Sequence, residues 1–312
     1  MPKAADSGFH RALAAGPHNP AILFRAANFY FTTGNYPAVL QHLSVILTNS
    51  DLSAYYTPAF LTYSRMGLPI ADVLSEGIPQ RPVAAQAFLR FLIQQGQIAE
   101  ADATWKWMSE RCLADPTIAS EYIAFLIAKK QAQRAAGIWG DLNHAAVPEY
   151  RYTNWIFNGS FEYPLRPSPL DWHIEPSENV RADRVRDMAR DGRSSLQLVF
   201  SGTDNLEYHR VAQQAVLGPG RWRLQAYIRT AGITTDQGIS VRIYDALQPQ
   251  RLDTRTDSLT GTHEWTKVDR VFVTTAETTL VQVEIMRQPS LRIDNKIAGT
   301  AWIDSVDLRP TH

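Results

Sequence analysis

The chain has 312 residues, which is enough for two domains of ordinary size. Lys plus Arg and Asp plus Glu balance at 31 each, so no overall field draws the chain to nucleic acid or to an anionic membrane, and we expect no nucleic-acid partner. Cys112 is the single cysteine, which excludes an intramolecular disulfide and a zinc site built on cysteines.

The N-terminal residues, Met-Pro-Lys-Ala-Ala-Asp, contain no apolar stretch of the kind found in a secretion signal, and no run of about 18 apolar residues follows. We therefore expect no membrane insertion by this sequence. Its location stays open. It is periplasmic or associated with the cell envelope if a signal or anchor was removed ahead of Met1, and cytoplasmic otherwise.

Apolar residues recur at helical spacing from Asn19 to about Asn143, which predicts a series of helices. Three glycines, Gly34, Gly67 and Gly96, interrupt the pattern at intervals of 33 and 29 residues. Asp115-Pro116 is a helix start signal, and a last short helix is expected before residue 144.

The glycine spacing is close to the period of about 34 residues that is typical of two-helix repeats. The segment from Ala27 to Tyr36 resembles the tetratricopeptide repeat, with Tyr30 and Tyr36 at its aromatic positions. The resemblance implies a tetratricopeptide-like helical repeat domain over residues 1–148. Such repeats usually bind a protein partner in their concave groove. The alternative interpretation is a scaffold that only orients the second domain.

Pro148 stops the last expected helix and places the domain boundary near residue 150. Beyond it, short strand signals alternate with turn residues, and no helical pattern intervenes. We therefore expect a multidomain α and β protein, whose residues 150–312 form an antiparallel β-sandwich. The expected strands cover residues 195–200, 212–217, 222–230, 239–246, 265–274, 280–287 and 302–308.

Two stretches at the ends of this half carry a second resemblance. Asn158-Gly159-Ser160-Phe161-Glu162 opens it with a turn dipeptide, and the alternating run from Trp302 to Leu308 closes it. Together they resemble the first and last strands of carbohydrate-binding-module jelly rolls, the galactose-binding-like β-sandwiches, over roughly residues 152–310. The resemblance implies that the two strands lie side by side and that Trp172 caps the core.

The same resemblance implies one structural Ca²⁺ ion, held by Glu162 of the opening stretch and Asp304 of the closing strand. Calcium takes about six to eight oxygen ligands, and Ser305 stands where many relatives have a second Asp, which removes one ligand. Two converging carboxylates repel each other unless a cation answers them. The alternative is therefore an Arg or Lys side chain, or a set of hydrogen bonds, in place of the ion.

No catalytic motif is present. The sequence has no Gly-x-Ser-x-Gly, no His-Glu-x-x-His and no phosphate-binding or dinucleotide-binding glycine loop. We interpret His173 with Glu175, and His263 with Glu264, as ordinary residues at loop or strand ends. The aspartates spaced by four residues form a solvated face: Asp183, Asp187 and Asp191. We expect the protein not to be an enzyme.

Polar residues on three expected strands supply a candidate binding face. Alternation puts the apolar residues of 222–229, 239–244 and 280–287 inward and their polar neighbours outward. If these strands share a sheet, its outer face combines aromatic rings with planar hydrogen-bonding groups, which suits a sugar as well as an ordinary solvated face. The candidate ligand-binding residues are Gln225, Tyr227, Arg229, Arg242, Tyr244, Gln282 and Glu284. Loops near Asp236 and Asn295 are the alternative place for a ligand.

These features favour a non-catalytic carbohydrate-binding and scaffold protein that binds a polysaccharide or glycan with its sandwich and a protein partner with its helical repeats. Such a pair of domains would suit bacterial exopolysaccharide or cell-envelope assembly. The alternative is a pure protein–protein interaction adaptor that does not bind sugar.

Overall fold

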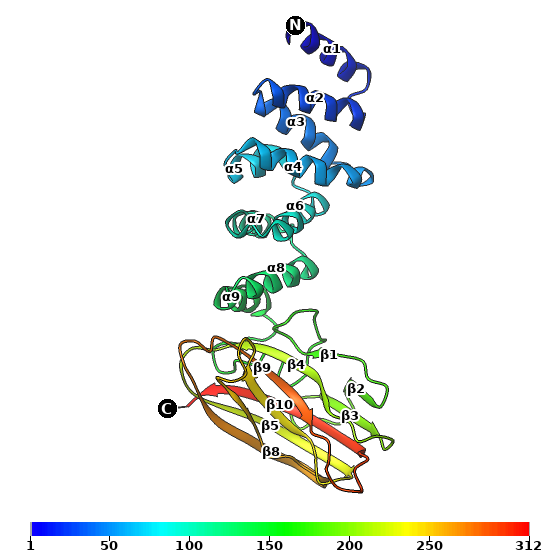
Figure 1. Cartoon of the computed structure of the whole chain (residues 1–312), viewed down its shortest axis with the longest axis vertical. Coiled ribbons are helices and arrows are strands. Elements are labelled where there is room, and N and C mark those ends of the chain that lie inside the picture. The colour runs from blue at the N-terminus through cyan, green and yellow to red at the C-terminus, as the bar shows by residue number, and fades with distance from the viewer. Residues whose placement is uncertain (1, 312) are drawn as a thin grey trace. The chain divides into compact units, whose positions relative to one another are not determined.

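A computed structural model describes residues 2–311, with side chains from Ser7 onward. The chain forms two compact units, one that ends at Tyr122 and one that begins at Ile123. The predicted multidomain α and β architecture is confirmed: helices fill the first half, and two antiparallel sheets form a jelly-roll sandwich in the second (Figure 1). The domain boundary near residue 150 stays a prediction. The last helix before the sandwich ends at Asn143, and the first strand begins at His173.

Short helices joined by tight turns make up the first unit. Their bounds are α1 Pro2–Ala15, α2 Pro20–Thr32, α3 Tyr36–Leu47, the 3-10 helix η1 Ser50–Tyr55, α4 Tyr56–Met66, α5 Ile70–Asp72, the π-helical turn η2 Val73–Gly77, α6 Pro82–Gln95, α7 Ile98–Glu110 and α8 Pro116–Ala128, which continues into the second unit.

The predicted helix breaks at the three glycines are confirmed. Gly67 and Gly96 follow α4 and α6 with φ of 65° and 71°, the left-handed conformation that glycine adopts without steric penalty. The start of α8 is also confirmed, because the Asp115 carboxylate accepts a hydrogen bond from the Ile118 N–H at 2.9 Å. The sequence did not predict α1 and η1. The tetratricopeptide resemblance stays a prediction.

Within the part of the chain that the structure describes, no helix is both long and apolar enough to span a bilayer.

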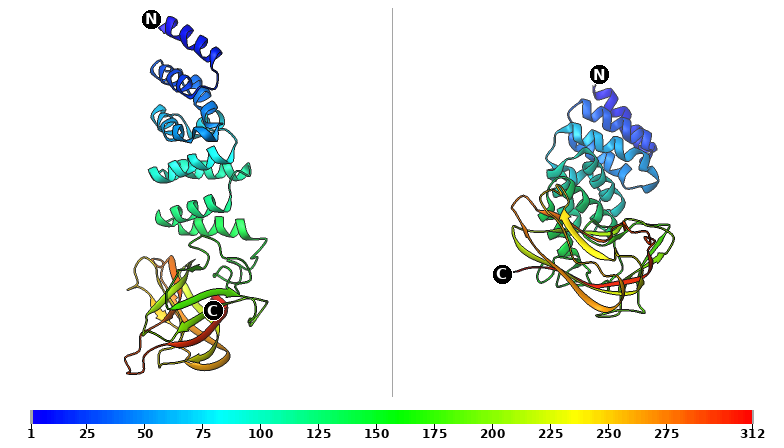
Figure 2. Two further views of the ribbon diagram at one scale, coloured as in Figure 1. Left: turned by 90° about the vertical axis from the view of Figure 1, so that its right-hand side faces the viewer. Right: turned by 60° about the horizontal axis from the view of Figure 1, so that its bottom comes forward.

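The second unit contains α9 Ala132–Asn143 and the strands of the sandwich. Their bounds are β1 His173–Ile174, β2 Val180–Val185, β3 Ser195–Ser201, β4 Tyr208–Val216, β5 Gly220–Ile233, β6 Ser240–Asp245, β7 Asp253–Arg255, β8 Gly261–Thr274, β9 Leu280–Arg287 and β10 Ala298–Pro310. Hydrogen bonds arrange them in two sheets with the orders β1-β4-β9-β6-β7 and β2-β3-β10-β5-β8. Figure 2 shows the strands in two views.

The core of the sandwich is the apolar set that alternation placed inward, and this prediction is confirmed. All of its members are buried: Trp222, Leu224, Ala226 and Ile228 of β5, Val241 and Ile243 of β6, and Val281, Val283 and Ile285 of β9. Full burial of one large aliphatic or aromatic side chain contributes about 1.5–3 kcal/mol. The two-residue period therefore fixes which face of each strand points to solvent.

The opening stretch is a turn and not the strand that the sequence predicted. Asn158 and Phe161 have φ of 50° and 55°, which interrupts any extended run. The stretch still lies beside the closing strand as expected, because Val306 N–H donates to Gly159 O at 2.8 Å and Trp155 N–H to Leu308 O at 2.9 Å. Trp172 is buried and stacks on Phe161 at 5.2 Å between ring centroids, as its expected role in the core requires.

Helix α9 packs on the sandwich as part of the second unit. The Trp139 ring meets the buried Phe157 ring edge-on, with centroids 5.0 Å apart. The Gln133 side-chain amide donates to Leu217 O, just beyond β4, at 3.2 Å. Phe157 in turn exchanges two hydrogen bonds with the side chain of Gln213 on β4. The helix therefore covers apolar surface that the strands leave open.

This packing predicts that a fragment of residues 131–312 is more stable than one of residues 150–312. Loss of α9 uncovers Phe157 and Tyr150 and removes Trp139, so we expect the unfolding free energy to fall by about 3–5 kcal/mol, the range for truncating a buried Phe or Trp. Urea denaturation followed by circular dichroism measures the difference. Equal midpoints and slopes would show that α9 does not stabilise the sandwich.

Candidate functional site

The predicted sugar-binding residues do not share a sheet, so they cannot form the single face that alternation suggested. Gln225, Tyr227 and Arg229 lie on β5, in the sheet β2-β3-β10-β5-β8. Arg242 and Tyr244 lie on β6, and Gln282 and Glu284 lie on β9, in the other sheet. The assumption that these strands are neighbours was wrong, because β5 pairs with β8 and β10 while β6 pairs with β7 and β9.

Tyr227 and Arg229 of the β5 group contact residues 186–194, which connect β2 to β3 and which we call the roof loop, whereas Gln225 lines a small hollow beside Arg223 and Asp307. The Arg190 guanidinium carbon lies 3.5 Å from the centroid of the Tyr227 ring. The Arg229 guanidinium donates to Met188 Sδ at 3.4 Å and pairs with Glu264 at 3.1 Å. A ring that already stacks on a guanidinium has lost that face for a ligand.

The β6 and β9 groups lie on the outer face of their sheet, where the register lines them up. Gln214 of β4 is opposite Gln282 of β9, and Gln282 is opposite Tyr244 of β6. At the next outward-facing position, two residues along each strand, Glu284 of β9 is opposite Arg242 of β6. Outward side chains on adjacent strands are close neighbours. Two amides and one phenol ring therefore form a continuous row across three strands.

A hollow of about 540 Å³ lies over this row, and we call it the cleft. Gln214, Tyr244, Gln282 and Glu284 line it from the sheet, and its rim includes His173 and Arg210. A volume of several hundred cubic ångströms is in the range of small-molecule and oligomer sites. Of the predicted ligand-binding residues, the structure brings Tyr244, Gln282 and Glu284 to this one place.

Arg242, also predicted as a ligand residue, is held beside the cleft by two carboxylates. Its guanidinium bonds Asp253 twice, at 2.7 and 2.8 Å, and the buried Glu284 once, at 2.9 Å. It also stacks over Tyr244 with 4.4 Å between its central carbon and the ring centroid. These hydrogen bonds raise the pKa of Arg242 and lower the pKa of Asp253. Its hydrogen-bonding fork is therefore used to orient Tyr244 and not left for a ligand.

The charged side chains of the cleft pair with one another. Arg210 pairs with Glu175 at 3.4 Å, and Glu284 pairs with Arg242 at 2.9 Å. One neutral group stands out, because Gln214 Oε1 is buried without a hydrogen-bond partner among the described residues. A buried amide oxygen without a donor favours any ligand that supplies one. The cleft is thus polar with balanced charge.

Sequence reasoning missed Gln214, His173 and Arg210. The phase of β4 was obscured by a bulge between Tyr208 and Val211, which shifts the alternation by one residue. Tyr208 itself is buried rather than available to a ligand. The run Ala212-Gln213-Gln214 held a usable signal, since alternation counted back from the core residue Leu217 puts Ala215 inward and Gln214 outward. His173 was interpreted as an ordinary strand-end residue, although β1 lies next to β4.

Glu162 and Asp304, the residues expected to hold calcium, both reach the roof loop. Glu162 Oε1 accepts the N–H groups of Arg193 and Ser194, each at 2.7 Å. Asp304 is fully buried, and its two oxygens accept main-chain N–H groups at 2.5 to 3.1 Å: those of Arg190, Asp191 and Ser305. Burial raises the pKa of Asp304, and these N–H groups oppose that rise.

This set of donors and acceptors does not fit a calcium ion. Calcium needs oxygen lone pairs free to face it, whereas here N–H groups face three of the four oxygens of the two carboxylates. Among the described residues, no group of three or more His, Cys, Asp or Glu side chains could hold a metal. The geometry favours the hydrogen-bonded alternative, and the binding of calcium stays a prediction for experiment.

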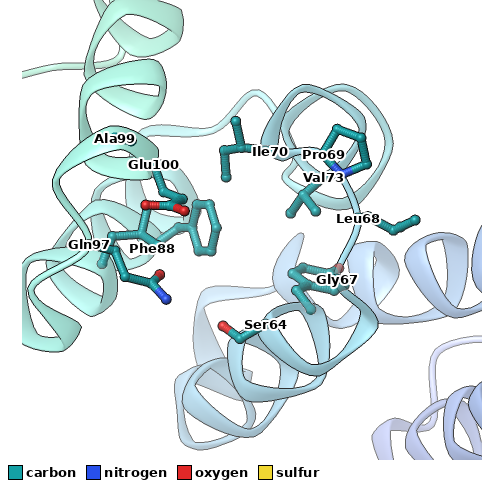
Figure 3. Close-up of a pocket in the computed structure, with 12 residues that line it drawn as sticks. Ser64, Gly67, Leu68, Pro69, Ile70, Val73, Phe88, Gln97, Ala99 and Glu100 are labelled. Carbon is teal, nitrogen blue, oxygen red and sulfur yellow. The ribbon is translucent and has the colours of Figure 1, made fainter.

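The helical unit has a hollow of its own, of about 420 Å³ (Figure 3). Ile70, Val73 and Phe88 line it with apolar surface, and Gln97 and Glu100 add polar groups. The hollow is formed by α4, α5, α6, α7 and the turns beside them. It is the feature of the first unit that could receive a peptide side chain.

Comparisons with known proteins leave the family open. No protein-family profile and no curated protein matches the chain. Among solved structures, "Family 16 Carbohydrate Binding Module-2" is 19% identical with a TM-score of 0.36, over 50% of this chain and 99% of that one. A CBM61 bound to β-1,4-galactotriose is 13% identical with a TM-score of 0.35, over 51% and 99%. The CBM22-1 xylan-binding domain of Paenibacillus barcinonensis Xyn10C is 12% identical with a TM-score of 0.34, over 49% and 91%.

At such low identities and TM-scores, these likenesses identify no ligand for this chain. Its own fold and cleft define a class: a helical unit joined to a jelly-roll sandwich, with a loop over part of one outer face and a polar hollow on the other.

The ion pairs beside the cleft predict a pH-dependent loss of stability in Arg242→Met. The change leaves Glu284 buried without its cation, so we expect the unfolding free energy at neutral pH to fall on the order of 3 kcal/mol. Arg242 lowers the pKa of Asp253 below its ordinary 3.8, so the stability it provides is complete above that pH and is lost as pH falls through the lowered pKa. The gap between wild type and variant should therefore narrow in acid.

Urea denaturation of both proteins at several pH values measures this gap. Arg221→Met, exposed on β5 of the other sheet and without an ion pair among the described residues, is the control for loss of one surface charge. A gap that is the same at neutral pH and at about pH 2, below the lowered pKa of Asp253, would contradict the electrostatic explanation and point to lost packing instead.

Proposed function

We propose that this protein is a non-catalytic carbohydrate-binding protein that holds a polysaccharide segment in the cleft of the sandwich. The observation that carries the proposal is the row Gln214, Gln282 and Tyr244, which places two amides and a half-buried ring across three adjacent strands of one open face. A pyranose offers a flat apolar face and a belt of hydroxyls, and these need a ring edge or face together with planar donors and acceptors.

The fixed position of Tyr244 supports this use. The Arg242 guanidinium stacks on one side of the ring, and the two carboxylates that hold Arg242 keep it there. A ring that is oriented before the ligand arrives loses little side-chain entropy on binding. Gln282, directly opposite on β9, supplies an amide that can donate and accept.

The balanced charge of the cleft favours a neutral sugar chain. A uronic acid or sulfated glycan would need a cation whose charge is not already answered, whereas Arg210 and Arg242 both face carboxylates. The half-buried Gln282 amide lines the cleft and can donate to or accept from a hydroxyl, which every neutral sugar supplies.

We also propose that the helical unit binds a protein partner. Its hollow beside Ile70, Val73 and Phe88 supports binding of a protein partner. A chain that binds glycan at one end and protein at the other would act as a scaffold, which suits bacterial exopolysaccharide or cell-envelope assembly. The competing function is an adaptor that uses the helical hollow alone, without sugar binding.

A glycan array probed with the full chain, followed by calorimetry on the best neutral and acidic oligosaccharides, tests the proposal. We expect Tyr244→Ala to weaken binding by about 1–3 kcal/mol, from the apolar ring area lost, or roughly 5- to 150-fold in Kd. Tyr244→Phe should keep most of the affinity, because it keeps the ring. Gln282→Ala should weaken binding by removing a hydrogen-bonding amide.

Tyr227→Ala is the matched control. It removes the same side chain from the other sheet, where the Arg190 guanidinium covers the ring. We expect it to bind sugar as the wild type does. If Tyr227→Ala abolishes binding and Tyr244→Ala does not, the ligand lies on the β5 face. An array with no signal for the full chain would favour the adaptor.

A further inference from the structure

Two carboxylates hold the roof loop on the sandwich, and neither of them lines the cleft. The loop spans residues 186–194 between β2 and β3, and it lies against the outer face of β5 and β10. Asp304 of β10 accepts the N–H groups of Arg190 and Asp191 at 2.8 and 3.1 Å. Glu162 of the opening stretch accepts those of Arg193 and Ser194. Two carboxylates therefore bind four main-chain donors of one loop.

Gly192 shows how closely Glu162 approaches the loop. Its φ is 68°, and a Cβ at this position would lie 2.5 Å from Glu162 Oε1. A side chain there would therefore displace the carboxylate from the N–H groups of Arg193 and Ser194. The chain conformation of the loop and the position of Glu162 depend on each other.

Arg184, the last residue but one of β2, joins the opening stretch to the loop. Its Nε donates to Phe161 O, and its Nη2 donates to Glu162 O at 2.6 Å and to Ser194 Oγ at 2.8 Å. Phe161 has φ of 55°, and this turn brings two consecutive carbonyl groups onto one guanidinium. The positive charge of the Arg184 guanidinium therefore lies among three oxygens: the carbonyls of Phe161 and Glu162 and the hydroxyl of Ser194.

Carbonyl and hydroxyl oxygens beside a carboxylate are the surroundings that a hard cation prefers. Here the guanidinium takes those oxygens with directional hydrogen bonds, and main-chain N–H groups take the carboxylates. Unlike an ion, the Arg184 side chain is part of the chain and needs no supply from solution.

We infer that Arg184 takes the place of a structural cation in this sandwich and that the roof loop closes without any divalent metal. Because Arg190 of the closed loop stacks on Tyr227, Arg184 also contributes to covering this ring of the β5 face. The inference rests on contacts of the opening stretch and the loop, none of which lines the cleft, so it can fail independently of sugar binding.

Hydrogen–deuterium exchange of the full chain, read on the peptide that contains the roof loop, together with the Tm of the sandwich, tests this inference. For the wild type we expect the same exchange and the same Tm in excess EDTA and in excess Ca²⁺. For Arg184→Met we expect exchange of the loop amides to rise roughly tenfold or more, since local opening becomes easier, and the Tm to fall. Arg184→Lys should lie between the two, because a single ammonium cannot reach all three acceptors.

Arg181→Met is the matched control. Arg181 lies on the same strand and is exposed; it pairs with the exposed Asp183 at 3.3 Å and donates to Gln197 Oε1 at 3.5 Å, and neither partner belongs to the roof loop. We expect it to leave loop exchange unchanged. A fall in the wild-type Tm or faster loop exchange in EDTA would overturn the inference, as would loop exchange in Arg184→Met equal to that of the wild type. If Arg184→Met does not fold, Arg184→Lys and the metal dependence of the wild type decide.

Discussion

The contact between the opening stretch and the closing strand is the constraint on which the rest of the sandwich depends. The Asn154 side chain donates to Val306 O at 3.0 Å and accepts from Leu308 N–H at 3.0 Å, and Gly159 is so close to Val306 O that a Cβ would overlap it. This contact joins residues about 150 positions apart in the chain. It sets Phe161 into the core against Trp172 and points Glu162 and Asp304 at one loop. A loop that both carboxylates bind can then lie flat on the sheet.

The two outer faces of the sandwich are unequal as a result. On the β5 side, Arg190 stacks on Tyr227 and the roof loop covers polar groups that would otherwise be solvated. On the other side, a hollow remains over Gln214 and Gln282, with Pro167 and Pro169 at its border. Both sheets have the same kind of inward apolar face, so the asymmetry comes from connections between strands. The open face is where a long, flexible ligand can lie without displacing the chain itself.

The ion pairs beside the cleft hold the ring of Tyr244 in one orientation. Arg242 binds two carboxylates and the ring of Tyr244 at once, so its charge fixes the position of an aromatic group. A buried ion pair of this kind adds little net stability compared with an apolar replacement, and its loss leaves an unanswered charge. This ion pair matters because it holds the Tyr244 ring in place, and a ring that is already in position loses less side-chain entropy when a ligand binds. Neutral hydroxyls remain the chemistry that Gln214 and Gln282 can recognise.

The helical first half, its turn glycines and the inward faces of β5, β6 and β9 follow from the sequence alone. They depend on local periods, 3.6 residues for helices and two for strands, which the burial of Leu224, Val241 and Val283 confirms. The meeting of Gly159 with Val306 could also be expected, from a resemblance at both ends of the sandwich. Which strands are neighbours could not, since period two is the same in every strand and says nothing of its partner. The tertiary structure alone put Tyr227 and Tyr244 on different sheets and brought Gln214 beside Gln282. It also placed the Arg184 guanidinium on the Phe161 and Glu162 carbonyls, because a hydrogen bond depends on positions in space and not on spacing along the chain.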